Sequence, residues 1–181
     1  EIRYTPVVKK YMRTIQTMEI INKKKHVKKK VCESRIEQIY HIRPEHLNGA
    51  GRLFGGRLME WIDEVAALVA IRHSECPVIT ASVDNLTFIR GVFQNDLIAL
   101  VGNVTYVGTT SMEIGVDTFI EHLDGTRYQV NRAYLTLIAV DSDGKPTTVP
   151  QLELETIGQQ AEWDAGKKRK ELRIQRGKEG F

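Results

Sequence analysis

One long apolar helix followed by four extended segments is the feature that most limits how this chain can fold. Residues 55–72 contain no proline, and Leu58, Ile62, Val65 and Val69 recur at the spacing of a helix. Further alanines and a methionine spread the apolar surface around much of the cylinder, so we expect other structure to bury this helix on several sides. It is expected to be the centre of the core.

Four segments after the helix have the composition and alternation of β-strands, with short polar or Gly-containing connections between them. They are Val78 to Phe88, Asp96 to Val107, Ser111 to Glu121 and Tyr128 to Val140. In the third segment apolar and polar side chains alternate, which predicts one core-facing surface. An earlier segment, Glu33 to Ile42, is expected to be a fifth strand. An antiparallel meander is the simplest topology for these strands.

The dimensions of these elements constrain how they pack. Five strands spaced about 4.8 Å apart make a sheet roughly 20 Å or more across, whereas one helix is only about 10 Å thick. We therefore predict an α+β fold in which a curled five-stranded antiparallel sheet wraps around one long central helix. A charged C-terminal helix is expected over residues 152–176. Apolar surface and strand edges remain, and such edges are usually paired or covered, so we expect self-association.

The length and composition of the chain indicate one globular domain. It has 181 residues, of which 41% are hydrophobic and 27% charged, as is usual for a single domain. We divide it into a basic, flexible extension over residues 1–30, a core domain over 31–150 and a charged helix or tail over 151–181. The net charge is +3, and two runs are basic, Lys23 to Lys30 and Lys167 to Arg176. Neither run lies beside a nucleic-acid-binding motif, so nucleic acid is not an expected partner.

Several features of the sequence favour a cytoplasmic protein. The longest apolar runs fall short of the roughly 20 residues that a membrane span needs, so no membrane association is expected. The start of the sequence lacks the apolar stretch of a secretory signal. Cys32 and Cys76 are too few for a disulfide framework.

The residues from 46 to 67, HLNGAGRLFGGRLMEWIDEVAA, carry a resemblance to a known family. Together with the preceding strand, the helix and the four later strands, this stretch resembles the hotdog-fold acyl-CoA thioesterases, including cytosolic and bacterial members. The resemblance covers about Cys32 to Pro150. Its most specific parts are Asn48, Phe54 to Gly56, Met59 to Asp63, and Gly108 to Ser111. It implies a hotdog fold, hydrolysis of acyl-CoA to a free acid and CoA, and side-by-side dimers that often assemble as hexamers.

Asp63 and Gly56 are the first candidates for the catalytic site. They are seven positions apart, about two helical turns, so they share nearly the same face. Helical side chains lean toward the N-terminus, which directs the Asp63 carboxylate toward the free N–H groups at the glycine-rich start. There the Gly56 N–H would stabilise an oxyanion while Asp63 activates a water molecule. Direct attack by Asp63 to give an anhydride stays open as a second route; we expect the water route.

Asn48 is the third catalytic candidate, because its amide both donates and accepts hydrogen bonds. The resemblance implies that it faces Asp63 of the neighbouring subunit, which would make the active site a property of a dimer. Without the resemblance, Asn48-Gly49 reads more simply as a turn.

The resemblance also implies positions that bind CoA. They are Arg90 and the turn residues Gly108, Thr109, Thr110 and Ser111, and Lys145 is a weaker candidate. The simpler alternatives are a surface ion pair for Arg90 and a plain hairpin tip for the turn. CoA is part of the substrate, so no cofactor is expected, and no HExxH or Cys/His cluster indicates a metal site.

Other functions fit the sequence less well. A serine hydrolase would need a GxSxG motif, which is missing. Some hotdog proteins are dehydratases with a histidine at the mouth of the helix; His46 is near, but the pair of Asn48 and Asp63 is not that arrangement. A noncatalytic acyl-CoA sensor would need a DNA-reading domain, for which only the basic tail is present.

Overall fold

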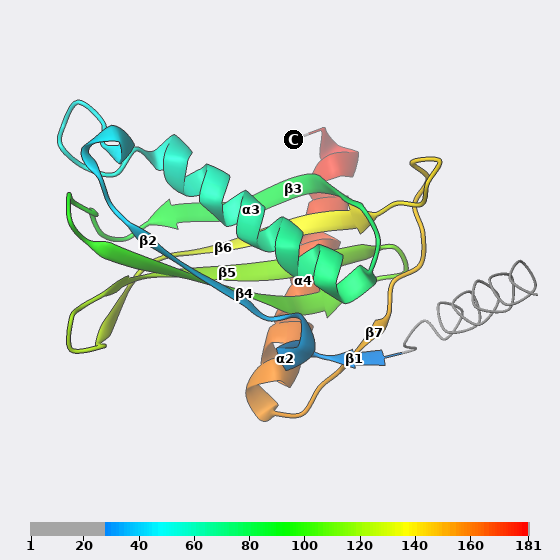
Figure 1. Ribbon diagram of the computed structural model, residues 1–181. Coiled ribbons are helices and arrows are strands. Elements are labelled where there is room, and N and C mark those ends of the chain that lie inside the picture. The colour runs from blue at the N-terminus through cyan, green and yellow to red at the C-terminus, as the bar shows by residue number, and fades with distance from the viewer. Residues whose placement is uncertain (1–27, 181) are drawn as a thin grey trace, which may run out of the picture.

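The computed structural model describes residues 28–180, and the structural statements below concern this range. Helix α3 (Gly55–Ser74) lies across one face of a five-stranded antiparallel sheet, and helix α4 (Ile157–Glu179) crosses the opposite face (Figure 1). The strands are β2 (Ile36–His41), β3 (Val78–Phe88), β4 (Leu97–Val107), β5 (Ser111–Glu121) and β6 (Arg127–Ala139). The predicted α+β architecture, a sheet around one central helix with a C-terminal helix added, is confirmed.

Helix α3 forms where the apolar periodicity predicts it. Leu58, Ile62, Val65 and Val69 are each at most 1% exposed, so the predicted stripe is the buried face of the helix. The helix runs two residues past the predicted end and stops where Glu75 takes a left-handed conformation, with φ of 58°. This places the core between α3 and the sheet.

The strand order is β2-β4-β5-β6-β3, which corrects part of the expected topology. Strands β4, β5 and β6 form the predicted meander, but β3 pairs with β6 and not with β4. Segment 89–96 between β3 and β4 is long enough to cross the end of the sheet, since three strand spacings span only about 14 Å. A β-bridge between Arg52 and Phe93 and the hydrogen bond from the Leu53 N–H to the Val92 carbonyl hold it there. Strands β2 and β3 are therefore the two edges.

The first predicted strand is shorter than expected. Helix α2 (Val31–Ser34) takes its first residues, and β2 begins only at Ile36. The Lys30 N–H donates a 2.6 Å hydrogen bond to Glu33 Oε2, which favours a helical turn at this point. Strand β1 (Lys28–Lys30) pairs in parallel with β7 (Gln151–Glu153), and neither was predicted. The basic extension predicted over residues 1–30 lies almost wholly outside the described residues.

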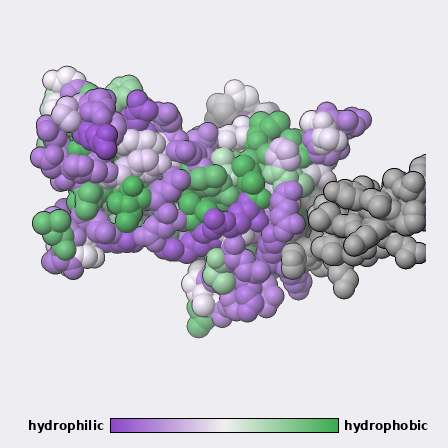
Figure 2. All heavy atoms as spheres, viewed as in Figure 1, coloured by the Kyte–Doolittle hydropathy of each residue, from purple (hydrophilic) through white to green (hydrophobic). Residues whose placement is uncertain are grey.

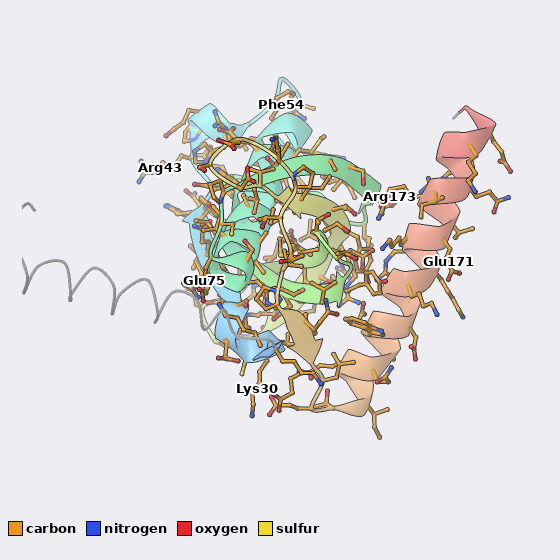
Figure 3. All side chains as sticks on the ribbon, turned by 90° about the vertical axis from the view of Figure 1, so that its right-hand side faces the viewer. Lys30, Arg43, Phe54, Glu75, Glu171 and Arg173 are labelled. Atoms are coloured by element: carbon orange, nitrogen blue, oxygen red, sulfur yellow. The ribbon has the colours of Figure 1, made fainter. Side chains whose placement is uncertain are left out.

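Helix α4 covers the outer face of the sheet, the face turned away from α3. Its arginines point toward the sheet: Arg169 pairs with Glu113 at 2.8 Å and Arg173 with Asp84 at 2.8 Å. Figure 3 shows Arg173 directed from α4 toward the strands. As a result Glu113 is only 2% exposed, so β5 is buried on its polar face as well as on its predicted core face. The helix begins at Ile157 because Thr156 caps it, five residues later than predicted.

Candidate active site

The loop before α3 is held by Asn48. Its side-chain Oδ1 accepts hydrogen bonds from the N–H groups of Ala50 (2.9 Å) and Arg52 (3.2 Å). This confirms that Asn48 forms a turn, the simpler of the two readings, but that turn occupies only the oxygen of the amide. Within residues 28–180 no acceptor bonds to the Asn48 Nδ2 group, and the residue is exposed. A donor is therefore left for another role.

The start of α3 presents free backbone donors. The first N–H groups of any helix have no acceptor within the helix, and the N-cap residue Phe54 supplies no side-chain acceptor. In the described part of the chain the N–H groups of Gly55 and Gly56 have no hydrogen-bond partner, whereas those of Arg57 and Leu58 bond to the Phe54 carbonyl. A Cβ on Gly56 would lie 2.5 Å from the Phe54 ring, so glycine is what lets the ring fold over the helix start.

A pocket of about 340 Å³ lies beside this helix start. Asn48, Gly55 and Arg90 line its polar side, and Leu58 and Phe88 are among its apolar walls. The structure thus brings Asn48 and Arg90, forty-two positions apart in the sequence, to one cavity with the free helix terminus. Gly56 is not in its wall, although the adjacent Gly55 is.

Asp63 lies further along α3 and outside this pocket. Its Oδ1 accepts a 2.8 Å hydrogen bond from Thr80 Oγ1 on β3, and the residue is half-buried. Within one chain the Asp63 carboxylate therefore contacts the sheet edge, and not the glycine-rich helix start to which we expected it to point. Sequence reasoning missed Thr80, because a threonine near the start of a strand has no distinguishing signal before the pairing of helix and strand is known.

Arg90 lies at the exit of β3 without a carboxylate partner in the described range. Its guanidinium lies 5.7 Å from the ring centroid of Tyr128, a cation–π contact that leaves the charge unneutralised. The alternative of a surface ion pair is therefore not what the structure shows. Arg90 instead lines the pocket beside the start of α3.

The turn Gly108–Ser111 lies at the other end of the sheet from Arg90, because the turn follows the end of β4 and Arg90 follows the end of β3, which runs antiparallel to β4. It joins β4 to β5, and its Gly108 N–H donates to the Ser111 carbonyl at 2.8 Å. An eleven-residue strand such as β4 is about 35 Å long, so these two groups of expected CoA-binding residues are not brought together within one chain. Lys145 lies in a separate turn, where its N–H bonds to Asp141 Oδ1.

His46 has a structural role in this chain. Its Nδ1 accepts a hydrogen bond from the Arg43 N–H at 3.2 Å, and its ring packs edge-on against Trp61. Trp61 stacks in turn on Tyr40 at 4.2 Å, and burial together with Glu64 raises the pKa of Tyr40 to about 12. These contacts of His46 give no support to a role as the catalytic histidine of a dehydratase.

Residues 28–180 contain no group of three or more His, Cys, Asp or Glu side chains placed to hold a metal ion. In the same range no helix has the length and apolar character needed to cross a membrane.

Comparison with known proteins identifies the class. The family model of the thioesterase superfamily matches residues 50–124. YkhA of Bacillus subtilis, described as an uncharacterised acyl-CoA thioester hydrolase, is 40% identical over 125 residues, which make up 68% of this chain and 73% of that protein. The chain belongs to the thioesterase superfamily. Within the superfamily it is a member of the acyl-CoA thioester hydrolases, as the resemblance implied. The cytosolic acyl coenzyme A thioester hydrolase of Rattus norvegicus is 33% identical over 77% of this chain, but only 37% of that longer protein is covered.

Solved structures of this thioesterase superfamily have the same fold. The acyl-CoA hydrolase of Staphylococcus aureus, in complex with butyryl coenzyme A, coenzyme A and coenzyme A disulfide, superimposes with a TM-score of 0.80 and 33% identity over 84% of this chain and 93% of that one. An apo-hexameric acyl-CoA thioesterase gives a TM-score of 0.79 at 37% identity, over 83% of this chain and 97% of that one. These likenesses confirm the predicted hotdog fold.

Structures of the Staphylococcus aureus enzyme include three alanine variants, at an asparagine, an aspartate and a threonine. In that protein the asparagine precedes the aspartate by fifteen positions, and the threonine follows the aspartate by seventeen. Asn48, Asp63 and Thr80 of this thioesterase have the same order and the same spacing. The threonine of this set is the residue that sequence reasoning missed.

Proposed function

We propose that this thioesterase hydrolyses acyl-CoA to a free acid and CoA, with Asp63 as the general base and the backbone amides at the start of α3 as the oxyanion hole. The observation that carries the assignment of Asp63 is its 2.8 Å hydrogen bond from Thr80 Oγ1. Thr80 occupies one carboxylate oxygen and fixes the orientation of the group, so the second oxygen can accept the proton of a water molecule. A placed general base contributes typically about 10²- to 10⁴-fold to the rate.

The reaction balances with these groups alone. Water attacks the thioester carbonyl while Asp63 takes its proton, and the carbonyl oxygen becomes an oxyanion that accepts hydrogen bonds from the free amides of Gly55 or Gly56. Collapse breaks the carbon–sulfur bond, and the thiolate of CoA leaves with the proton that Asp63 returns. One oxyanion donor typically contributes about 3 to 4 kcal/mol. We propose that no cofactor is needed, because CoA arrives with the substrate.

The site is proposed to be shared between two subunits. Asp63 lies outside the pocket that holds Asn48 and the helix start of its own chain, so the base and these donors would act on one substrate only if a second copy brings them together. The edge strand β3 leaves apolar side chains uncovered, with Ile79 55% and Val83 46% exposed. Apolar residues also lie along α3 on the face seen in Figure 2. Pairing two copies through this edge would bury them.

The relatives support a proposal about higher assembly and location. A hexameric acyl-CoA thioesterase has this fold, and we propose that two-fold dimers of this chain likewise assemble in threes. Cys32 and Cys76 are both free, which fits a reducing compartment, and a relative is named cytosolic. We therefore propose a cytoplasmic location.

The test is release of free thiol from a series of acyl-CoA substrates by the purified protein. We expect Asp63→Ala to lower kcat by at least 10²-fold while CoA affinity stays within a few-fold. Glu60→Gln is the matched control, because Glu60 is an exposed acid on the same helix whose carboxylate pairs with Arg57 on the helix surface. Turnover by Asp63→Ala at the wild-type rate would remove Asp63 from the mechanism, and a wild-type chain that releases no thiol would overturn the proposed activity.

A further inference from the structure

Helix α4 crosses the strands of the outer face one after another. Trp163 lies against Tyr106 of β4, with ring centroids 4.7 Å apart, and six residues later Arg169 pairs with Glu113 of β5 at 2.8 Å. The helix is close to the sheet here, since a Cβ on Gly166 would lie 2.8 Å from Glu113 Oε1. The first half of α4 is therefore packed directly on the strands of its own chain.

The second half of α4 reaches β3 and continues past it. Asp84 of β3 binds both Arg173, at 2.8 Å, and Arg176, at 3.1 Å, and β3 is an edge of the sheet. After Arg176 the helix continues to Glu179, about 5 Å further, which is one strand spacing. Figure 1 shows this end of α4 beyond β3. The last turn therefore lies where a sixth strand would run if the sheet continued.

The side of α4 that faces the sheet is open at this end. A pocket of about 330 Å³ lies between the helix and β3, lined by Asp84, Arg169, Leu172, Gln175, Arg176 and Glu179. The last four of these have the i, i+3, i+4, i+7 spacing of one helix face. Leu172 belongs to this face and is nevertheless 57% exposed, because the described sheet ends at β3. The pocket is thus the space that one further strand would fill.

We propose that the end of α4, residues 172–179, packs on the outer face of a second copy of this chain at the β3 edge. This inference rests on the proposed function for the edge at which two copies meet. When two copies pair through β3, the partner's β3 takes the place of a sixth strand and closes the pocket under Leu172. A two-fold axis repeats the contact, so each subunit holds the other from its outer face.

This contact also affects the proposed base. Thr80 orients Asp63 from β3, and Asp84, four residues later on the same strand, binds α4. A helix bound to its own β3 through Asp84 and to the partner through Leu172 joins the two edge strands that orient the bases of both sites. Loss of the contact should therefore lower the activity together with the stability of the dimer.

The first experiment measures the dissociation constant of the dimer by sedimentation velocity across a dilution series. We expect Leu172→Lys to raise this constant at least ten-fold, because each of two equivalent contacts loses a buried leucine side chain. Leu172→Met keeps the volume and should retain most of the affinity. Ile174→Lys is the matched control and should leave the constant unchanged, since Ile174 is 50% exposed on the same helix but lies outside the pocket.

The second experiment identifies what Leu172 contacts. Leu172 is replaced by the photo-crosslinking amino acid benzoylphenylalanine, and this chain is exchanged with ¹⁵N-labelled wild-type chain before irradiation. We expect mass spectrometry to find the crosslink in a labelled peptide from β3 or from the end of α4. Capture only within the unlabelled chain, or no capture of the labelled chain, would overturn the inference. Capture of a labelled peptide from another element would indicate a contact between dimers and would also overturn it.

The two experiments separate this inference from the proposed function. A dimer that is unaffected by Leu172→Lys overturns the role of α4 and leaves the shared site intact. A dimer that Leu172→Lys dissociates supports the role of α4, even if Asp63→Ala were to keep the wild-type rate and so remove the proposed base. A wild-type chain that is monomeric would overturn both the contact and the shared site.

Discussion

Thr80 Oγ1 on β3 and Asp63 Oδ1 on α3 are joined by a 2.8 Å hydrogen bond that ties the edge of the sheet to the central helix. Because Thr80 belongs to the edge strand, the position of the proposed base depends on the strand through which two subunits are proposed to pair. The base and the proposed interface are therefore mechanically connected.

Removal of the Thr80 hydroxyl should slow the reaction without preventing substrate binding. We expect Thr80→Val to lower kcat about ten-fold, because one hydrogen bond to a charged group contributes on the order of 1.5 kcal/mol or more, and to change KM little. Thr80→Ser retains the hydroxyl and should keep most of the rate. Steady-state kinetics with one acyl-CoA measure the difference. A Thr80→Val enzyme as fast as the wild type would show that Asp63 needs no such partner.

Two inactive variants should restore activity when they are mixed. In a shared site, a dimer of one Asn48→Ala subunit and one Asp63→Ala subunit keeps one site with both residues intact. When the two variants are mixed in equal amounts and their subunits pair at random, the mixture should therefore recover about a quarter of the wild-type activity per subunit. The measurement is thiol release after subunit exchange has been demonstrated with differently tagged chains. No recovery despite exchange would place Asn48 and Asp63 in the same subunit's site.

A charge on the exposed edge strand should separate the subunits. Val83 on β3 is 46% exposed, and we expect Val83→Lys to shift the chain to a monomer with strongly reduced activity, because a lysine at a buried interface is costly. Ile157→Lys is the control, since Ile157 is 91% exposed at the start of α4. Light scattering coupled to size-exclusion chromatography gives the mass. A Val83→Lys protein that stays assembled would place the interface elsewhere.

The ion pair between Arg169 on α4 and Glu113 on β5 should contribute to the free energy of unfolding. Glu113 is 2% exposed and bonds to Arg169 and to the Thr105 hydroxyl at 2.7 Å. Arg169→Met leaves a buried carboxylate without its cation, which costs about 3 to 5 kcal/mol. Arg57→Met breaks an exposed i,i+3 pair on α3 and should cost less than about 1 kcal/mol. Urea denaturation measures both; equal midpoints would mean that α4 contributes little to the fold.

His73 should give the free energy of unfolding a component that depends on pH. Its ring is fully buried between Ser34 Oγ and the Pro150 carbonyl, and burial lowers its pKa below the ordinary value of 6.5. The unfolded chain therefore binds a proton at pH values where the folded chain does not. Stability from this group is complete above about pH 6.5 and falls as the pH is lowered toward the folded pKa.

Replacement of His73 tests this component. We expect the fall in unfolding free energy between pH 7.5 and 5.5 to be smaller in His73→Gln than in the wild type, although the variant is less stable at both values. His122→Gln, on an exposed turn, should keep the wild-type slope. Urea denaturation at each pH provides the data, and identical slopes for wild type and His73→Gln would exclude His73 as the source.

Local pattern predicted the elements of this thioesterase well and their long-range pairing less well. The stripe of Leu58, Ile62, Val65 and Val69 determines both the helix and its buried face, so α3 was predictable. The place of β3 beside β6 was not, because an antiparallel neighbour on either side gives the same alternation along the strand. The burial of Glu113 was not predictable either, since it depends on helix α4, which follows some fifty residues later in the sequence.

The residues of the candidate site likewise fall into those that local sequence identifies and those that it does not. Asn48, Asp63 and the glycines could be identified from one continuous stretch and its resemblance to a family. Thr80 could not be identified in this way, because its role depends on a partner on another element, the Asp63 carboxylate.

The pairing of β3 with β6 sets Val78 opposite Ala139, so the strand that carries Thr80 is anchored only after most of the chain has been made. Contacts between residues so far apart in sequence form late, since the intervening loop must close first. We expect a partly folded chain, even one with α3 and the β4–β5 hairpin in place, to be inert toward thioesters. Completion of the fold and onset of activity would then be the same event.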